Sequence, residues 1–231
     1  MFERPHHRRI AAVLQALDAD VLEANACLFG GGTAIALRHG EYRESVDIEF
    51  LVSQVEGYRQ LRERLTGPDG LRAITRPGHV LEATREMRAD RYGMRTLLRV
   101  DDAIIKFEIV LEGRIALEPP GPADRLCGVA TLTPLDMVTS KLLANADRWR
   151  DDAVLSRDLI DLAMMAPPKA LLQRAMTKAQ AAYGASVAAA LARAVQDLRT
   201  RPQRLDACMK AMAMTTVSKA ALWARIKALL R

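Results

Sequence analysis

The pattern of apolar and polar positions is most informative in the first quarter of the chain. From Val46 to Val52, apolar residues alternate with acidic ones, which is the period-two pattern of a strand. This run is preceded by a short apolar run ending at Phe29, by Gly30–Gly32 and by the apolar residues Ala34–Leu37. The pattern therefore predicts a strand, a glycine-rich turn, a short helix and a second strand, in that order.

The remaining pattern divides the chain into a mixed first part and a helical second part. The Pro- and Gly-rich segment Glu118–Pro122 is the best candidate boundary, and predicts a core over 1–118 and a helical domain over 119–231. The fold class predicted is α/β (α+β), with a mixed sheet in the core. Helices are expected at 6–18, 20–25, 54–65, 133–148, 169–182, 185–198 and 218–230, with one more beginning at Ser156, and strands at 27–29, 92–100 and 103–111.

Two carboxylates in the alternating run are the first candidate for chemistry. Asp47 and Glu49 are two residues apart, so on a strand they would share one face. Neighbouring carboxylates are costly unless a positive group lies between them, and Mg²⁺ prefers such oxygen ligands together with water and phosphate. Glycines and a helix start just upstream suit an approaching phosphate. The alternative is a tight turn followed by an edge strand with a solvated acidic face.

The same stretch resembles a known family. The segment GGTAIAL at Gly31–Leu37 and the segment RESVDIEF at Arg43–Phe50 resemble motifs of the AbiEii/AbiGii toxin family of nucleotidyltransferases. A second block, with KLLA at Lys141–Ala144 and RDLIDL at Arg157–Leu162, resembles two further segments of that family. The resemblance covers roughly residues 8–165, and implies a polymerase-β-like nucleotidyltransferase core.

The resemblance also implies roles for particular residues. Metal ligands would be Asp47, Glu49 and, on a neighbouring strand, Glu108, which is also a possible base. The family more often has Asp at the position of Glu49, whose side chain is one methylene longer. Nucleotide-binding residues would be Gly31, Gly32, Thr33, Arg43, Ser45 and Lys141, and catalytic residues would be Asp47, Glu49, Glu108, Lys141, Asp158 and Asp161.

Several of these residues also have a structural interpretation. Lys141 lies on a predicted helix and is either a phosphate contact or an exposed lysine. Asp161 is flanked by apolar residues, and a buried carboxylate must be paired. Arg157 and Lys141 are its candidate partners, and such a pair is either structural or catalytic. Three further arginines, Arg91, Arg95 and Arg99, are interpreted as the solvent face of the sheet rather than as triphosphate contacts.

Charge is distributed unevenly along the chain. The net charge is +6, but residues 163–231 contain twelve Lys and Arg against two Asp, and no Glu follows Glu118. A basic helical segment is typical of a chain that binds an acidic partner, most readily a nucleic acid. The alternative is a composition rich in Arg and Ala with solvated charges.

Cysteine content and hydropathy bear on the compartment. Cys27, Cys127 and Cys208 are odd in number and far apart, which favours a reducing setting without a disulfide framework. The N-terminus is polar, and no apolar run approaches the length of a membrane span. We therefore expect a cytoplasmic protein without a membrane partner.

Together with the resemblance, these features predict transfer of a nucleoside monophosphate from an NTP, such as ATP, to an acceptor hydroxyl, with Mg²⁺ or Mn²⁺ as cofactor. The resemblance implies a toxin of a bacterial toxin–antitoxin system, an RNA acceptor such as the 3′ end of tRNA, and a cognate antitoxin protein. Two other hypotheses remain open. One is a small-molecule nucleotidyltransferase, which would not need the basic tail; the other is a non-catalytic binding protein with a degraded site.

Overall fold

The structure is a computed structural model that describes residues 2–230. The chain forms two compact units. The first comprises Met1–Ala34 and Ser45–Thr133, and the second comprises Ile35–Glu44 and Pro134–Arg231. Helix α3 (Gly31–Arg38) begins in the first unit, and its second half belongs to the second unit. The chain therefore leaves the first unit at α3, returns to it before the second strand, and leaves it again after Thr133.

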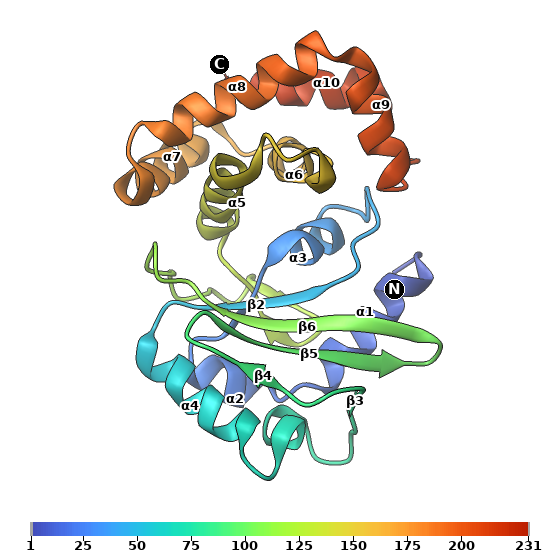
Figure 1. Cartoon of the computed structure of the whole chain (residues 1–231), viewed down its shortest axis with the longest axis vertical. Coiled ribbons are helices and arrows are strands. Elements are labelled where there is room, and N and C mark those ends of the chain that lie inside the picture. Colours follow the sequence, from blue (N-terminus) through green and yellow to red (C-terminus); the bar gives the residue numbers. More distant parts are fainter. Residues whose placement is uncertain (1, 231) are drawn as a thin grey trace. The chain divides into compact units, whose positions relative to one another are not determined.

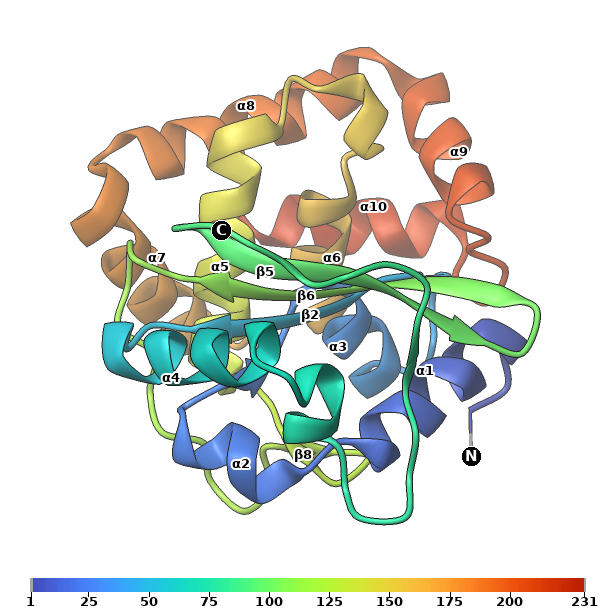
Figure 2. The same ribbon diagram turned by 60° about the horizontal axis from the view of Figure 1, so that its bottom comes forward.

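The first unit is built on a mixed six-stranded sheet. The strand order is β1-β2-β6-β5-β3, with β4 also paired to β5, and β2 and β6 are parallel while the other pairs are antiparallel. Figures 1 and 2 show α2 and α4 on the same side of this sheet. The strands are β1 (Leu28–Phe29), β2 (Ile48–Val52), β3 (Glu82–Ala83), β4 (Arg88–Ala89), β5 (Gly93–Val100) and β6 (Ala103–Leu111).

Helices and a small hairpin complete the first unit. The helices are α1 (Pro5–Ala16), α2 (Ala19–Ala24), α4 (Val55–Thr66) and the 3₁₀ helix η1 (Gly70–Ile74), and the hairpin joins β7 (Arg125–Leu126) to β8 (Val129–Ala130). Its turn residues Cys127 and Gly128 both have positive φ, as the tight turns of two-residue hairpins require. The core is mostly aliphatic and includes tilted ring contacts between Phe29 and Phe50 and between Phe50 and Phe107.

The second unit is helical. Helix α5 (Pro134–Arg148) packs against α6 (Arg157–Met165), α7 (Lys169–Tyr183) and α8 (Ser186–Thr200). Figure 1 shows the later helices arranged around α5 and α6. The unit is completed by the 3₁₀ helix η2 (Asp152–Val154), α9 (Pro202–Ala211) and α10 (Lys219–Ala228), and α10 packs against α6. Alanines at 175, 179, 190 and 194 are buried and allow α7 and α8 to approach their neighbours closely.

The predicted mixed α/β fold is confirmed, and so are most predicted elements, with ends shifted by one or two residues. Two local predictions were wrong, and one helix was missed. Strand β2 begins at Ile48, two residues later than predicted, so Asp47 lies directly before the strand rather than within it. Helix α9 was not predicted. Ser156 occupies the N-cap of α6 in a left-handed conformation, but its side chain makes no capping hydrogen bond.

Candidate active site

The glycine-rich turn of the first unit packs directly against Glu49. Gly31 has a φ of +66°, and a β-carbon placed on it would lie 2.7 Å from Glu49 Oε2 and 3.0 Å from Glu49 Cβ. The Gly30 N–H donates to the backbone carbonyl of Glu49 at 2.9 Å. Only glycine satisfies both the left-handed backbone and this close approach. The start of α3, with N–H groups that lack acceptors within the helix, is thereby held beside a carboxylate of β2.

Two hydroxyl groups fix the segment that leads into β2. The Thr33 hydroxyl is 2.8 Å from the Ser45 hydroxyl and donates to the backbone carbonyl of Asp47. The Ser45 N–H donates to His7 Nε2 at 3.0 Å, and His7 is fully buried. The Asp47 side chain itself is exposed. The Asp47 backbone is therefore anchored to α3 while its carboxylate faces solvent.

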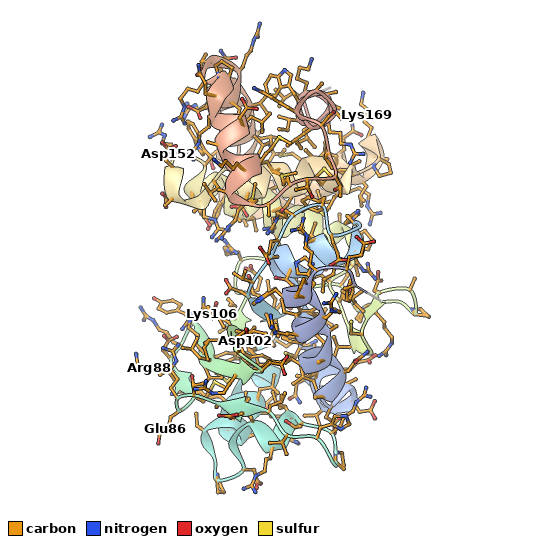
Figure 3. The ribbon with its side chains drawn as sticks, turned by 90° about the vertical axis from the view of Figure 1, so that its right-hand side faces the viewer. Glu86, Arg88, Asp102, Lys106, Asp152 and Lys169 are labelled. Carbon is orange, nitrogen blue, oxygen red and sulfur yellow. The ribbon has the colours of Figure 1, made fainter. Side chains whose placement is uncertain are left out.

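Glu108 lies beside Glu49 on the sheet. The two are register partners in the parallel pairing of β2 and β6, so their side chains leave the sheet on the same face. The Arg95 guanidinium donates to Glu108 Oε1, and Lys106 Nζ donates to Glu108 Oε2 at 2.6 Å. Figure 3 labels Lys106, two residues before Glu108 on the same strand. Both oxygens of Glu108 thus accept a hydrogen bond from a cation. Arg95, interpreted from the sequence as part of the solvent face of the sheet, is therefore engaged in an ion pair with Glu108.

The oxygen ligands at this place fit a hard divalent cation. Mg²⁺ is commonly bound by one or two carboxylates, with water and substrate phosphates in its other positions. Glu49 provides a carboxylate beside the helix start that a phosphate would approach, and the exposed side chain of Asp47 lies two residues before it in the chain. Over residues 2–230, no cluster of three or more His, Cys, Asp or Glu side chains is arranged to hold a metal by itself. Any metal here would depend on substrate phosphates for further ligands.

The second unit contains a buried cluster of charges centred on Asp158 and Asp161. Lys141 Nζ lies 2.9 Å from Asp158 Oδ1 and 2.8 Å from Asp161 Oδ2. Arg148 Nε donates to Asp158 Oδ2 at 2.7 Å and Arg148 Nη2 donates to Oδ1 at 2.9 Å. Lys141 and both aspartates are at most 5% exposed. Of the two candidate partners for Asp161, Lys141 is the one that the structure places in contact with it.

Arg43 completes this cluster. Its Nε donates to Asp161 Oδ1 at 2.7 Å, its Nη2 donates to Oδ2 at 3.0 Å, and the Tyr42 hydroxyl donates to Oδ1 at 2.6 Å. Asp161 therefore accepts a bidentate guanidinium, a hydroxyl and an ammonium group. Such charge-assisted bonds are the condition for keeping a buried carboxylate ionised.

The pKa values of these groups follow from competition between burial and pairing. Burial raises the pKa of Asp161, but Arg43 and Lys141 outweigh it and hold the pKa below its ordinary value. The pKa of Asp158 is likewise lowered, because Lys141 and Arg148 outweigh its burial. Burial lowers the pKa of Lys141, yet the two aspartates bring it above its ordinary value. All three groups are therefore charged at neutral pH.

Several partners of the candidate residues were missed by sequence reasoning. Tyr42, Arg148 and His7 have no motif that marks them, and each contacts its partner across a separation visible only in the fold. Lys106 could have been found, because it precedes Glu108 by two residues on a predicted strand and period two places them on one face.

In the described part of the chain, no helix is long and apolar enough to cross a membrane.

The architecture resembles two solved structures from Helicobacter pylori. A Helicobacter pylori protein assigned as a nucleotidyltransferase matches with a TM-score of 0.53 and 15% identity, covering 97% of this chain and 93% of that one. The H. pylori protein JHP933 matches with a TM-score of 0.52 and 15% identity, covering 100% of this chain and 94% of that one. At this identity the likeness establishes the fold. Among curated proteins, no relative matches the chain.

The family follows from the sequence itself. The profile of the nucleotidyl transferase AbiEii toxin family, of type IV toxin–antitoxin systems, matches residues 12–229. The chain belongs to this family, and its class of enzyme is nucleotidyltransferase. The match includes the basic C-terminal helices, so the family extends well beyond the two motif blocks that suggested it.

Proposed function

We propose that this chain transfers a nucleoside monophosphate from an NTP to a hydroxyl of an RNA acceptor, with the 3′ end of tRNA as the first candidate. The observation that carries the proposal is the packing of the Gly31 turn and the start of α3 against Glu49. It combines, within one unit, a phosphate-binding helix start with a carboxylate suited to a divalent cation. The strongly basic C-terminal helices support an RNA acceptor.

In the proposed reaction, an acceptor hydroxyl attacks the α-phosphorus of the NTP. A new phosphorus–oxygen ester bond forms, the bond between the α-phosphorus and its bridging oxygen breaks, and pyrophosphate leaves with that electron pair. The hydroxyl proton passes to a base, for which Glu108 is the candidate in this chain. Bound Mg²⁺ or Mn²⁺ would offset the charge that develops on the triphosphate.

Residues of the first unit would bind the metal, approach the phosphates and position the Asp47 segment. Asp47 and Glu49 would hold the metal, with Glu108 as a third carboxylate if it exchanges one of its two cations for the metal. Gly31 and Gly32 would bring the backbone close to phosphate. Thr33 and Ser45 would hold the Asp47 segment in place through their hydroxyl groups, rather than cradle phosphate as first expected, because these hydroxyls are buried and bonded to each other.

In the second unit, Lys141, Asp158, Asp161 and Arg43 would act mainly as positioning residues. Their charged atoms are engaged with one another and almost fully buried. A triphosphate would therefore have to displace an aspartate before it met Lys141 or Arg43. We propose that this cluster fixes the fold of the helical unit around α5 and α6, and that it orients Lys141 for any contact with substrate.

The setting proposed is that of the family. A nucleotidyltransferase toxin needs a cognate antitoxin as a partner that restrains it, and its NTP and tRNA substrates imply a cytoplasmic site of action. The antitoxin partner is proposed from family membership.

The test is incubation with each α-³²P-labelled NTP, Mg²⁺ and total tRNA, beside an Asp47→Ala variant. Label that appears on RNA with the wild type and not with the variant supports the proposal. Label on a small molecule instead would favour the small-molecule alternative. No transfer to any acceptor, together with no Mg²⁺-dependent NTP binding, would contradict the proposal and favour a non-catalytic binding protein.

A further inference from the structure

A pocket lies entirely within the helical unit. Its volume is about 420 Å³, and it is formed where the C-terminal end of α5, the end of α7 and the first turns of α8 meet. That volume is within the range of small-ligand pockets, which begins at about 300 Å³. The lining consists of two aromatic residues, two arginines, one aspartate, one serine and three alanines: Trp149, Tyr183, Arg150, Arg193, Asp147, Ser186, Ala146, Ala189 and Ala190.

The aromatic residues give this pocket its chemistry. Trp149 and Tyr183 both line the pocket and are both half-buried. Each side chain is therefore partly accessible and partly packed against the helical unit. The Arg150 guanidinium carbon lies 5.0 Å from the centre of the Trp149 ring. Aromatic rings and stacked guanidinium planes are the surfaces on which unpaired bases stack, regardless of sequence.

Charge and space are consistent with a nucleotide. Arg150 and Arg193 are exposed at the pocket. Their two positive charges outnumber the one negative charge of the lining, that of Asp147. The alanine side chains at Ala146, Ala189 and Ala190 are small, which leaves room for a flat ring between α5 and α8. Two guanidinium groups match one phosphodiester, whereas a metal–triphosphate would require more carboxylates than Asp147 alone provides. These properties favour a nucleotide of an RNA strand over an NTP.

We propose that this pocket, called the Trp149 pocket, binds one unpaired nucleotide of the RNA acceptor. The base stacks against Trp149 and Tyr183, and its phosphate faces Arg150 and Arg193. Asp147 accepts a hydrogen bond from an exocyclic amino group, which favours bases that carry one. The inference rests on the proposed function for the nature of the acceptor, and it extends that function by placing an RNA contact on named residues.

Tryptophan fluorescence tests the proposal without any catalytic step. The chain has two tryptophans, and Trp223 lies outside the pocket on α10, so Trp223→Phe leaves Trp149 as the sole tryptophan, which is excited selectively at a wavelength where tyrosine does not absorb. A short single-stranded oligoribonucleotide is titrated into this variant without Mg²⁺ or NTP. Stacking of a base on Trp149 predicts saturable quenching. In the otherwise wild-type chain, Trp149→Ala should weaken RNA binding by roughly tenfold, measured by anisotropy of a labelled oligonucleotide.

Matched variants separate the pocket from general charge. Arg193→Ala should weaken binding several-fold, while Arg199→Ala, which removes the same charge from an exposed position six residues further along α8, should have a much smaller effect. Trp149→Phe retains a ring and should keep most of the affinity, which distinguishes stacking from a loss of folding. Circular dichroism of each variant checks that the helical unit is intact.

Two results would overturn the proposal. One is the absence of quenching by oligoribonucleotides at concentrations where anisotropy shows that RNA is bound. The other is equal quenching by an NTP alone at the same concentration, which would make this a donor-nucleotide pocket. Neither depends on catalysis, so a failure here leaves transfer at Asp47 and Glu49 untouched, and a failure of transfer leaves the quenching result valid.

Discussion

Arg43 and Asp161 form a bidentate ion pair inside the second unit, with Nε to Oδ1 at 2.7 Å and Nη2 to Oδ2 at 3.0 Å. The two residues are 118 positions apart in the chain, and both are almost fully buried. The segment that carries Arg43 returns from α3 towards β2, so this pair ties an early segment of the chain to α6. Loss of this ion pair should therefore lower the free energy of unfolding before it affects any other property.

Breaking this pair should be costly. Arg43→Leu leaves the Asp161 carboxylate buried with fewer partners, and removal of one member of a buried pair costs about 3–5 kcal/mol of unfolding free energy. Urea denaturation followed by circular dichroism measures the loss. The matched control is Arg59→Leu, which removes solvent-exposed ion pairs with Glu56 and Glu63 and should cost far less. Equal losses in the two variants would contradict the structural role given to Arg43.

The same cluster predicts a pH dependence of stability. Asp158 and Asp161 have folded-state pKa values below their ordinary value of 3.8, so their contribution is present above about pH 4. It is lost as the pH falls below 3.8 towards the lower folded-state values. Lys141 has a raised pKa, so its contribution is complete below 10.5 and is lost as the pH rises above that value. Unfolding free energy measured across pH should fall at both ends, and Asp158→Asn should flatten the acid limb.

Gly31 and Gly40 offer a matched pair of glycine variants. Both have positive φ, but a β-carbon on Gly40 meets nothing within 4 Å, whereas one on Gly31 lies 2.7 Å from Glu49 Oε2. Gly40→Ala should cost about 1 kcal/mol of backbone strain and leave activity nearly unchanged. Gly31→Ala adds the displacement of Glu49, and should lower nucleotidyl transfer by at least tenfold. Similar activities for the two variants would show that the turn does not position the site.

Glu108 is tested by its metal dependence rather than by activity alone. If Glu108 is a metal ligand, Glu108→Gln should raise the Mg²⁺ concentration needed for half-maximal transfer several-fold. If it only pairs with Arg95 and Lys106, the variant should lose about 1 kcal/mol of stability and keep its Mg²⁺ dependence. Glu82→Gln, which removes an exposed carboxylate that pairs with Arg99 on β5, is the matched control.

Periodicity and turn chemistry predicted much of the fold. The β5–β6 hairpin, the glycine turn and the long helices followed from local pattern, because each repeats over enough residues to be distinctive. Helix α9 was missed because a proline opens it and its apolar residues, such as Leu205 and Cys208, are few. The start of β2 was misplaced because Asp47 continues the alternation in sequence, although the strand pairing begins at Ile48.

The candidate site was predictable only where residues are close in sequence. Glu49 and the glycines are part of one motif, and so are Asp158 and Asp161. By contrast, the register of β2 against β6, which places Glu49 beside Glu108, depends on a parallel pairing between distant strands. The burial of Lys141 and Arg43 depends on the packing of α5 and α6. No local pattern contains that information, since it arises from tertiary contacts.

The central claim is that Asp47 and Glu49 support metal-dependent nucleotidyl transfer, and pyrophosphate release tests it most directly. Release is measured with NTP and total tRNA over a range of Mg²⁺ concentrations, for the wild type and for the double variant Asp47→Asn, Glu49→Gln. The wild type should release pyrophosphate only with Mg²⁺. The double variant should release it at least a hundredfold more slowly, while circular dichroism shows that it remains folded. Release at the wild-type rate from the folded double variant would contradict the account.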